Sequence, residues 1–402
     1  MVEQQEVGVA VTKPVSALQA LTASALSITG MASTQAATQP EDTKLGVRFT
    51  QYNESDVTSD RVLIGSQERY SIDVLQLSFQ TPIFSEYALN TYVAYETMSG
   101  ASAYRSYLNN SDQTVIEMSG ASGGIEEQRL DASIGLSRYR KYTETTSTLA
   151  VSQEKDYQSI AFSYDYAIEN RKRWLALLSS FSVSYDTLNP TDADLFTDRA
   201  VATDETKTSV SAYGGFNRVI NKFSTLQMGI GANILNGYLS DPYRVQDQRP
   251  DSRIQTTFTT QYRKYSPLIG GSWHFDYRYY QDDWQVQAHT FDTSVWKEFS
   301  TGGVEWILAP SLRYYWQHEA EFYNLEQDPT ANEFYSNDFR LSAYGAVTLG
   351  IDVFMYIRDV KISVGVSQYQ SDESWGQTGQ QDTETPTLVD FTTFSVGLDV
   401  TF

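Results

Sequence analysis

Hydrophobic and polar residues alternate along many segments of this chain, and the alternation predicts β-strands. The clearest case is the last nine residues, where Phe394, Val396, Leu398, Val400 and Phe402 alternate with Ser395, Gly397, Asp399 and Thr401. Residues 130–137, 160–166 and 226–234 repeat the pattern. One side of each segment is uniformly apolar and the other is small and polar. A strand that crosses a bilayer, over ~9–11 residues, needs lipid on one side and a polar lumen on the other.

The alternation and the turn residues together predict an all-β chain with sixteen strands. We place them over 44–52, 69–82, 87–98, 127–137, 145–152, 156–169, 172–186, 205–219, 223–240, 253–264, 268–280, 284–299, 303–317, 338–353, 360–370 and 388–402. Fourteen strands is the alternative, because 145–152 and 253–264 are the weakest segments. Pro310 falls inside a predicted strand, where it requires a bulge or a missing ladder bond.

The connections between these strands differ in length on the two sides. Every second one is short, whereas most others are long and acidic: 53–68, 99–126, 187–204, 241–252, 318–337 and 371–387. Short periplasmic turns and long extracellular loops are the pattern of an outer-membrane barrel. The sequence therefore predicts a transmembrane antiparallel β-barrel with both termini on the same side.

Aromatic residues make up 13% of the chain and gather at predicted strand ends. Examples are Tyr277, Tyr279 and Trp284 in one hairpin, and Trp306, Tyr314 and Trp316 in one strand. Amphipathic rings at the headgroup level form the two girdles of a membrane barrel. Ordinary sheet packing also favours aromatic residues, so the girdles support the barrel only together with the alternation and the loops.

Composition excludes several classes of site and partner. The chain has 402 residues, no cysteine, three histidines and a net charge of -21. The absence of cysteine excludes disulfides, thiol nucleophiles and thiolate metal sites. A chain this acidic lacks the positive surface that binding to nucleic acid requires. No nucleophile elbow, phosphate loop or zinc-protease motif occurs, so we expect no enzyme activity, no metal and no cofactor.

The amino terminus has the order of a secretory signal. Lys13 precedes an uncharged stretch of small and apolar residues from 15 to 36. We predict a signal peptide over 1–36, with cleavage after Ala36 or alternatively after Ala32, and a barrel over 37–402.

Several short motifs resemble a family of uncharacterised Gram-negative outer-membrane proteins, a domain-of-unknown-function family. They are 98–102 (MSGAS) with its echo 118–122, 237–244 (GYLSDPYR), 249–253 (RPDSR), 277–284 (YRYYQDDW) with His289, and 313–315 (RYY). The loop residues that these motifs single out are Gly100, Gly120, Asp241, Pro242, Arg249, Pro250 and Asp251.

The resemblance implies an outer-membrane location, with lipid and lipopolysaccharide around the barrel, and implies no reaction. Genes of the family often lie beside genes for exported flavin-transferase and thioredoxin-like proteins, which implies a possible periplasmic redox partner. The terminal Phe402 resembles the signal by which the barrel assembly machinery takes up outer-membrane barrels.

Counting residues from the turns predicts a polar row inside the barrel. The turn at 281–283 places Asp276 opposite His289, and the turn near Thr301 places Arg313 opposite His289. Arg278, two residues from Asp276, is a further candidate for the lumen. The row is either a selectivity or proton-linked element, because histidine titrates near neutral pH, or a cross-strand ladder that neutralises charges. A register slip of one residue moves a member to the lipid face.

Loop 99–126 is flanked by the two MSGAS segments, and glycine lets a backbone approach closely. The loop either folds inward as a constriction or stays on the surface with two flexible corners. Its two arms are similar in length and are able to pair above the membrane.

These predictions give three functional hypotheses. The first is a channel or carrier for small polar solutes or ions, since sixteen strands enclose enough room. The acidic excess would favour cations only if the acids line the lumen. The second is a non-conducting barrel that serves a periplasmic or extracellular redox partner. The third, an enzyme, has no support in the sequence.

Overall fold

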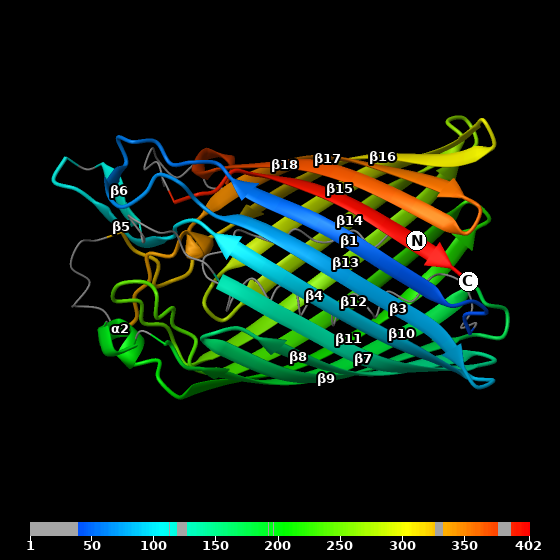
Figure 1. Ribbon diagram of the computed structural model, residues 1–402, viewed down its shortest axis with the longest axis horizontal. Coiled ribbons are helices and arrows are strands. Elements are labelled where there is room, and N and C mark those ends of the chain that lie inside the picture. Colours follow the sequence, from blue (N-terminus) through cyan, green and yellow to red (C-terminus); the bar gives the residue numbers. More distant parts are fainter. Residues whose placement is uncertain are drawn as a thin grey trace.

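The computed structural model describes residues 39–402 except 112, 119–126, 192, 196, 326–332 and 377–386. The predicted signal peptide, 1–36, lies outside the described residues. Sixteen strands form one closed antiparallel barrel, and a separate three-stranded sheet lies at one end (Figure 1). The all-β class and the count of sixteen are therefore confirmed, and the alternative of fourteen strands is wrong.

Around the ring each strand pairs with its neighbours in chain order, apart from the extra sheet. The barrel strands are β1 (Lys44–Glu54), β3 (Ser71–Ile83), β4 (Tyr87–Ser99), β7 (Glu127–Arg140), β8 (Thr143–Gln153), β9 (Tyr157–Glu169), β10 (Leu175–Leu188), β11 (Glu205–Asn221), β12 (Ser224–Gly237), β13 (Ser252–Ser266), β14 (Gly271–Asp282), β15 (Gln287–Thr301), β16 (Val304–Gln317), β17 (Tyr344–Ile357), β18 (Val360–Asp372) and β19 (Phe391–Thr401). The weakest predicted segments, 145–152 and 253–264, are the central parts of β8 and β13.

The two ends of the barrel differ. At the turn end, short turns join the strands, and β1 closes the ring by pairing with β19, from Lys44 opposite Thr401 to Glu54 opposite Phe391. Phe402 lies at this end, where its N–H donates to the Thr43 carbonyl at 2.8 Å and its side chain is exposed. At the loop end, the longer connections gather beyond the strand tips (Figure 1).

The two faces of the barrel wall differ as the alternation predicts. Large apolar side chains are exposed on the outer face of every strand, for example Leu149 (45%), Phe162 (43%) and Leu349 (60%). The lumenal face carries small, polar and charged side chains, such as Ser163 and Asp165 on β9. The alternation lets each strand present apolar side chains to the outside and polar side chains to the lumen. Its backbone hydrogen bonds are meanwhile all made to the neighbouring strands of the closed ring.

The small sheet is built from loops beyond the barrel. β2 (Val62–Ile64) pairs with β6 (Thr114–Met118), and β6 pairs with β5 (Ala103–Leu108). The two arms of loop 99–126 therefore pair with each other. Gly100 has a φ of +113°, and a Cβ there would collide with the Arg69 carbonyl oxygen, so the position requires glycine. The second predicted corner, Gly120, lies outside the described residues.

Several predicted strands start later than expected, and for two of them, β17 and β15, the local structure gives the reason. Residues 338–343 were assigned to a strand, but β17 begins at Tyr344 and these residues fold as a loop with a 3-10 turn, η2 (Phe339–Leu341). β15 begins at Gln287 because 283–286 form the connection, with Gln285 at a φ of +70°. At Pro310 the ladder between β15 and β16 is interrupted without a register shift, as a strand proline requires.

Helical structure is minor in the described part of the chain. It comprises α2 (Thr197–Ala200) and the 3-10 turns η1 (Ala193–Leu195), η2 and η3 (Glu373–Trp375). None of the described helices has the length and apolar character to span a membrane.

Candidate functional site

The connections at the loop end hold one another in place. We call the described residues of 55–70, 100–118, 238–251, 318–343 and 387–390 the cap. Within it, Val245 N–H donates to the Tyr104 carbonyl at 3.0 Å, and Leu108 N–H donates to the Leu325 carbonyl at 3.1 Å. Arg69 donates to the carbonyls of Leu388 and Thr387 at 2.6 and 2.8 Å. These bonds to main-chain oxygens join loops 100–118, 238–251 and 318–343 to one another, and loop 55–70 to 387–390.

One stretch of the cap enters the barrel. We call residues 335–343 the inner segment; most of its side chains are buried. Phe339 packs against a cluster of lumenal residues from β1, β3, β4, β17, β18 and β19 and of two cap residues: Tyr52, Ile72, Met98, Tyr344, Ala346, Tyr369 and Phe391, with Tyr70 and Val389 from the cap. Leu341 packs instead against Trp284, Val286 and Ala320. The inner segment thus packs against the lumenal wall through Phe339 and against the connection between β14 and β15 through Leu341.

Asp338 fixes the inner segment electrostatically. Its side chain is fully buried and caps η2 by accepting from Arg340 N–H at 3.1 Å. Three guanidinium groups converge on its carboxylate. Arg249 donates from Nη2 at 2.9 Å, Arg340 donates from Nε at 2.8 Å, and Arg244 Nη2 lies 3.5 Å from Oδ1.

The arginines are held in turn by two carboxylates of loop 238–251. Arg249 donates to both oxygens of Asp247, at 2.7 and 2.9 Å. Asp241 accepts from Arg340 Nη2 at 3.2 Å and lies 3.7 Å from Arg244 Nε. Three arginines face three aspartates, so this ion cluster carries no net charge. Burial without that balance would cost several kcal/mol per ion.

The charges in the cluster determine how Asp338 titrates. Burial alone raises the pKa of the Asp338 carboxyl, but the three nearby arginines outweigh that effect and hold its pKa well below its usual range. Asp338 therefore stays ionised at any physiological pH, and the cluster is a permanent tie between loops 238–251 and 318–343.

A second polar tie lies at the connection between β14 and β15. Asp282 accepts from the N–H groups of Trp284 and Val286, at 3.0 and 2.9 Å, and from Arg253 Nε at 2.8 Å. The Arg253 guanidinium also lies 4.1 Å from the Trp284 ring centre. These bonds fold 283–286 into a compact turn and place Trp284 in the cluster that contains Leu341 of the inner segment.

A third cluster lies on β4, β7 and the turn after β8, across the ring from β14 and β15, and it has more acidic than basic side chains. Arg129 on β7 lies 2.5 Å from Glu96, 3.4 Å from Asp131 and 3.1 Å from Glu154. Glu154 belongs to the short turn between β8 and β9. Burial raises the pKa of Glu154 to about 8; Arg129 opposes that effect, whereas Glu127 and Glu96 reinforce it.

The predicted lumenal row is wrong in its register. Asp276 lies opposite Asp292 and Gln261, not opposite His289, and Arg313 lies opposite Asp292. Arg263 Nη2 donates to Asp276 at 2.9 Å, and Arg313 Nε donates to Asp292 at 2.6 Å. A ladder of Arg–Asp pairs therefore crosses β13–β16, with Asp292 where His289 was predicted.

His289 lies on the outer face. It is opposite Tyr279 and Trp316, its ring stacks on Trp316 with centroids 4.6 Å apart, and its Nδ1 is 2.9 Å from the Tyr277 hydroxyl. The count failed because Trp284 and Val286 were assigned to the strand, whereas both belong to the turn. That error also reversed the faces, since Ala288 rather than His289 points inward.

The remaining candidates have these positions. Arg278 is on the lumenal face of β14, between Thr259 and Thr290. Asp241 and Arg249 are members of the ion cluster. Pro242 is buried beside them, and Pro250 and the exposed Asp251 lead into β13. The sequence did not identify Arg244, Asp247, Asp338 or Arg340 as site residues, although Arg244 stands inside the 237–244 motif.

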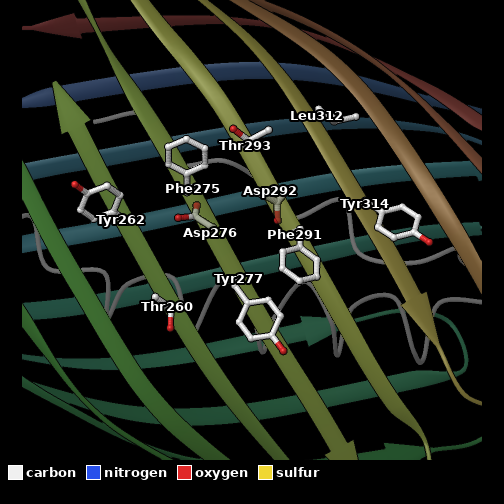
Figure 2. A pocket seen from close by; sticks show the side chains of 10 residues that line it. All are labelled: Thr260, Tyr262, Phe275, Asp276, Tyr277, Phe291, Asp292, Thr293, Leu312 and Tyr314. Carbon is white, nitrogen blue, oxygen red and sulfur yellow. The ribbon is translucent and has the colours of Figure 1, made fainter. Parts of the chain in front are cut away.

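The outer surface over β13–β16 has a shallow apolar groove of about 360 Å³. Figure 2 shows Phe275, Tyr277, Phe291, Leu312 and Tyr314 along it, on neighbouring strands. Asp276 and Asp292 also line it, but both carboxylates pair with arginines, so the groove offers mainly apolar contacts. The described part of the chain has no group of three or more histidine or acidic side chains placed to hold a metal ion.

Comparisons with known proteins show the family. No curated protein matches the sequence. Similar solved structures include a bacterial polysaccharide outer membrane secretin (10% identity, TM-score 0.48, 89% of this chain and 98% of that one). CdiB from Escherichia coli has 11% identity and a TM-score of 0.48, over 89% of this chain and 63% of that one. A BenF-like porin from Pseudomonas fluorescens Pf-5 has 6% identity and a TM-score of 0.45, over 90% and 98%.

At these identities and TM-scores the structures carry no argument about function. The sequence match is different in kind, because one family profile, described as "Protein of unknown function (DUF3570)", matches residues 18–395. That range includes every barrel strand except the end of β19, together with the whole cap. The chain therefore belongs to the DUF3570 family.

Proposed function

We propose that the protein is an outer-membrane channel for small polar solutes or ions, held closed at rest by the inner segment. The observation that carries the proposal is the contrast between the faces of the ring: an apolar exterior on all sixteen strands, and a lumen in which small, polar and charged side chains prevail outside the cluster around Phe339. An apolar exterior of this extent is unstable in water but suits a bilayer. A polar lumen suits water and solutes.

The cap supports a closed resting state. Phe339 packs the inner segment against the lumenal wall, Leu341 packs it against the turn between β14 and β15, and the ion cluster ties it to loop 238–251. Passage past these residues requires the inner segment to move. Because Asp338 is the one carboxylate that all three arginines contact, its replacement should release the segment.

Single-channel recording tests the proposal. Protein purified from outer membranes is inserted into planar bilayers, and the wild type is compared with Asp338→Asn. We expect brief, rare openings for the wild type and a much higher open fraction for the variant. Asp372→Asn is the matched control, since Asp372 also caps a 3-10 turn through a backbone N–H but lies outside the ion cluster.

Each outcome has a distinct meaning. Equal open fractions in wild type and Asp338→Asn would contradict the proposal that the inner segment is a gate. If neither protein conducts, and a variant that lacks residues 335–343 does not conduct either, the proposal of a channel is wrong and the non-conducting alternative is favoured.

That alternative has one supporting observation. β2 is an edge strand of the small sheet, and its Leu63 and Ile64 side chains are exposed, 54% and 57%. An apolar edge strand suits addition of a strand from a partner protein. The proposal assigns no reaction and no cofactor to the barrel, and it expects lipid and lipopolysaccharide around it and delivery by the barrel assembly machinery.

A further inference from the structure

We infer that the lumen is selective for cations and that a patch around Asp165 on β9 is where they bind. The inference deepens the proposed function and rests on it. It starts from the sign of the charges that the register places on the lumenal face.

Lumenal charges are distributed unevenly around the ring. The register places eight acidic and two basic side chains inside on β4 and β7–β11, a net charge of -6. The same reading of the other ten strands gives eight acidic and seven basic side chains, a net charge of -1. One contiguous wall therefore carries almost all of the excess negative charge.

Within that wall, Asp165 differs from the paired acids. Glu96, Asp131 and Asp186 have Arg129 or Lys207 within 4 Å. Asp165 is only 8% exposed, and among the described residues no basic group pairs with its carboxylate; its one favourable side-chain interaction is with the Ser180 hydroxyl directly across from it. A buried carboxylate without a counter-ion is costly, and a cation supplied from the lumen would remove that cost.

The surroundings of Asp165 are oxygen atoms. Ser163, two residues away on the same face, is fully buried, and its Oγ lacks a partner in the described chain. The residues directly across from these two all carry hydroxyls: Thr146, Thr148, Ser180 and Ser182. No basic side chain occupies these cross-strand positions.

One carboxylate surrounded by hydroxyls suits a small cation, because hard cations prefer oxygen ligands. A single charge also keeps binding weak, and conduction requires a site that releases its ion readily. Glu144 and Glu169, near the turn end of β8 and β9, extend the negative strip. We therefore assign the patch to a hydrated or partly dehydrated monovalent cation, potassium or an ammonium ion.

The test is a reversal potential in a KCl gradient, measured on protein purified from outer membranes. At about 4 Å in water one unit charge changes the local concentration of a monovalent ion about fivefold. We expect the ratio of potassium to chloride permeability to exceed one, and to fall about fivefold in Asp165→Asn. Asp165→Glu keeps the charge and should keep most of the selectivity.

Asp276→Asn is the matched comparison, because it removes the same charge from the wall where acids and bases balance. A smaller change there than in Asp165→Asn supports the patch. Equal changes, or a wild-type channel that does not prefer potassium, would overturn the inference and leave the channel itself intact.

A second readout decides the matter if the pore stays closed. The midpoint of heat-induced unfolding is compared in KCl and in N-methylglucamine chloride at equal ionic strength, since a bound ion stabilises the folded state. The wild type should unfold at a higher temperature in KCl, and Asp165→Asn should show no difference. Equal midpoints for the wild type would overturn the inference.

Discussion

Replacing Arg249 with methionine should open the cap and leave the barrel folded. The change removes two hydrogen bonds to Asp247 and one to Asp338, all between 2.7 and 2.9 Å. Asp338 keeps Arg244 and Arg340, but the fully buried Asp247 loses its nearest cation and, within the described part of the chain, retains only the Ser336 hydroxyl and the Asp241 N–H. Leaving a buried charge without its partner costs about 3–5 kcal/mol.

Hydrogen exchange followed by mass spectrometry measures that cost. If the cap opens as a local unit, amides of the inner segment should exchange about 10²–10⁴-fold faster in the variant. Amides in the centre of β9 serve as the internal control and should not change. Asp247→Asn in the same variant removes the stranded charge and should restore much of the protection.

Two results would refute this reasoning. A change of less than about tenfold in the inner segment would show that the ion cluster does not hold it. An equal change in β9 would show that the cap and the barrel open together.

Other predictions follow from burial, charge and the two faces. Asp338 has a lowered pKa in the folded protein, so its contribution is present above about pH 4 and is lost as the pH falls further; protection of the inner segment from exchange should persist from neutral pH to about pH 4. Glu154 has a raised pKa of about 8 in the folded protein, so its contribution to stability is fully present below about pH 4.3 and is lost as the pH rises through 8. The temperature midpoint of unfolding should therefore fall between about pH 5 and 9 in the wild type, and should fall less in Glu154→Gln. Phe162→Arg, on the outer face near the middle of β9, should destabilise the barrel by about 2–4 kcal/mol, whereas Ser182→Arg on the lumenal face should cost far less, and urea titration in vesicles compares them.

The barrel is largely predictable from the sequence, because each strand must meet lipid-like and polar surroundings on opposite faces. The last nine residues illustrate this: Phe394, Val396 and Leu398 are exposed outside, and Asp399 pairs inside with Lys361 at 2.7 Å. The same constraint acts on all sixteen strands, so even the weakly patterned β8 and β13 were found. Period-two alternation carries this information within each strand.

The site was less predictable, because turns and loops determine it. The Asp282 side chain folds the turn at 283–286 through hydrogen bonds to the backbone, and such a turn leaves no alternating pattern in the sequence. The strand boundary was therefore misplaced, and the register of His289 was counted wrongly. The ion cluster joins Arg249 to Asp338, 89 residues away, through two loops that have no period. The motifs at 237–244 and 249–253 did point to two of its members, Asp241 and Arg249, and the first motif also contains Arg244.

Cysteine labelling across the wall tests the central claim, a water-lined lumen inside an apolar exterior, most directly. Native cysteine is absent, so single replacements at Ser180, Phe181, Phe258 and Thr259 report only themselves. In outer-membrane vesicles, a small water-soluble thiol reagent should modify positions 180 and 259, which face inward on β10 and β13. Positions 181 and 258 should react only with a reagent that partitions into lipid. Equal labelling at neighbouring positions, or the reverse pattern, would contradict the account.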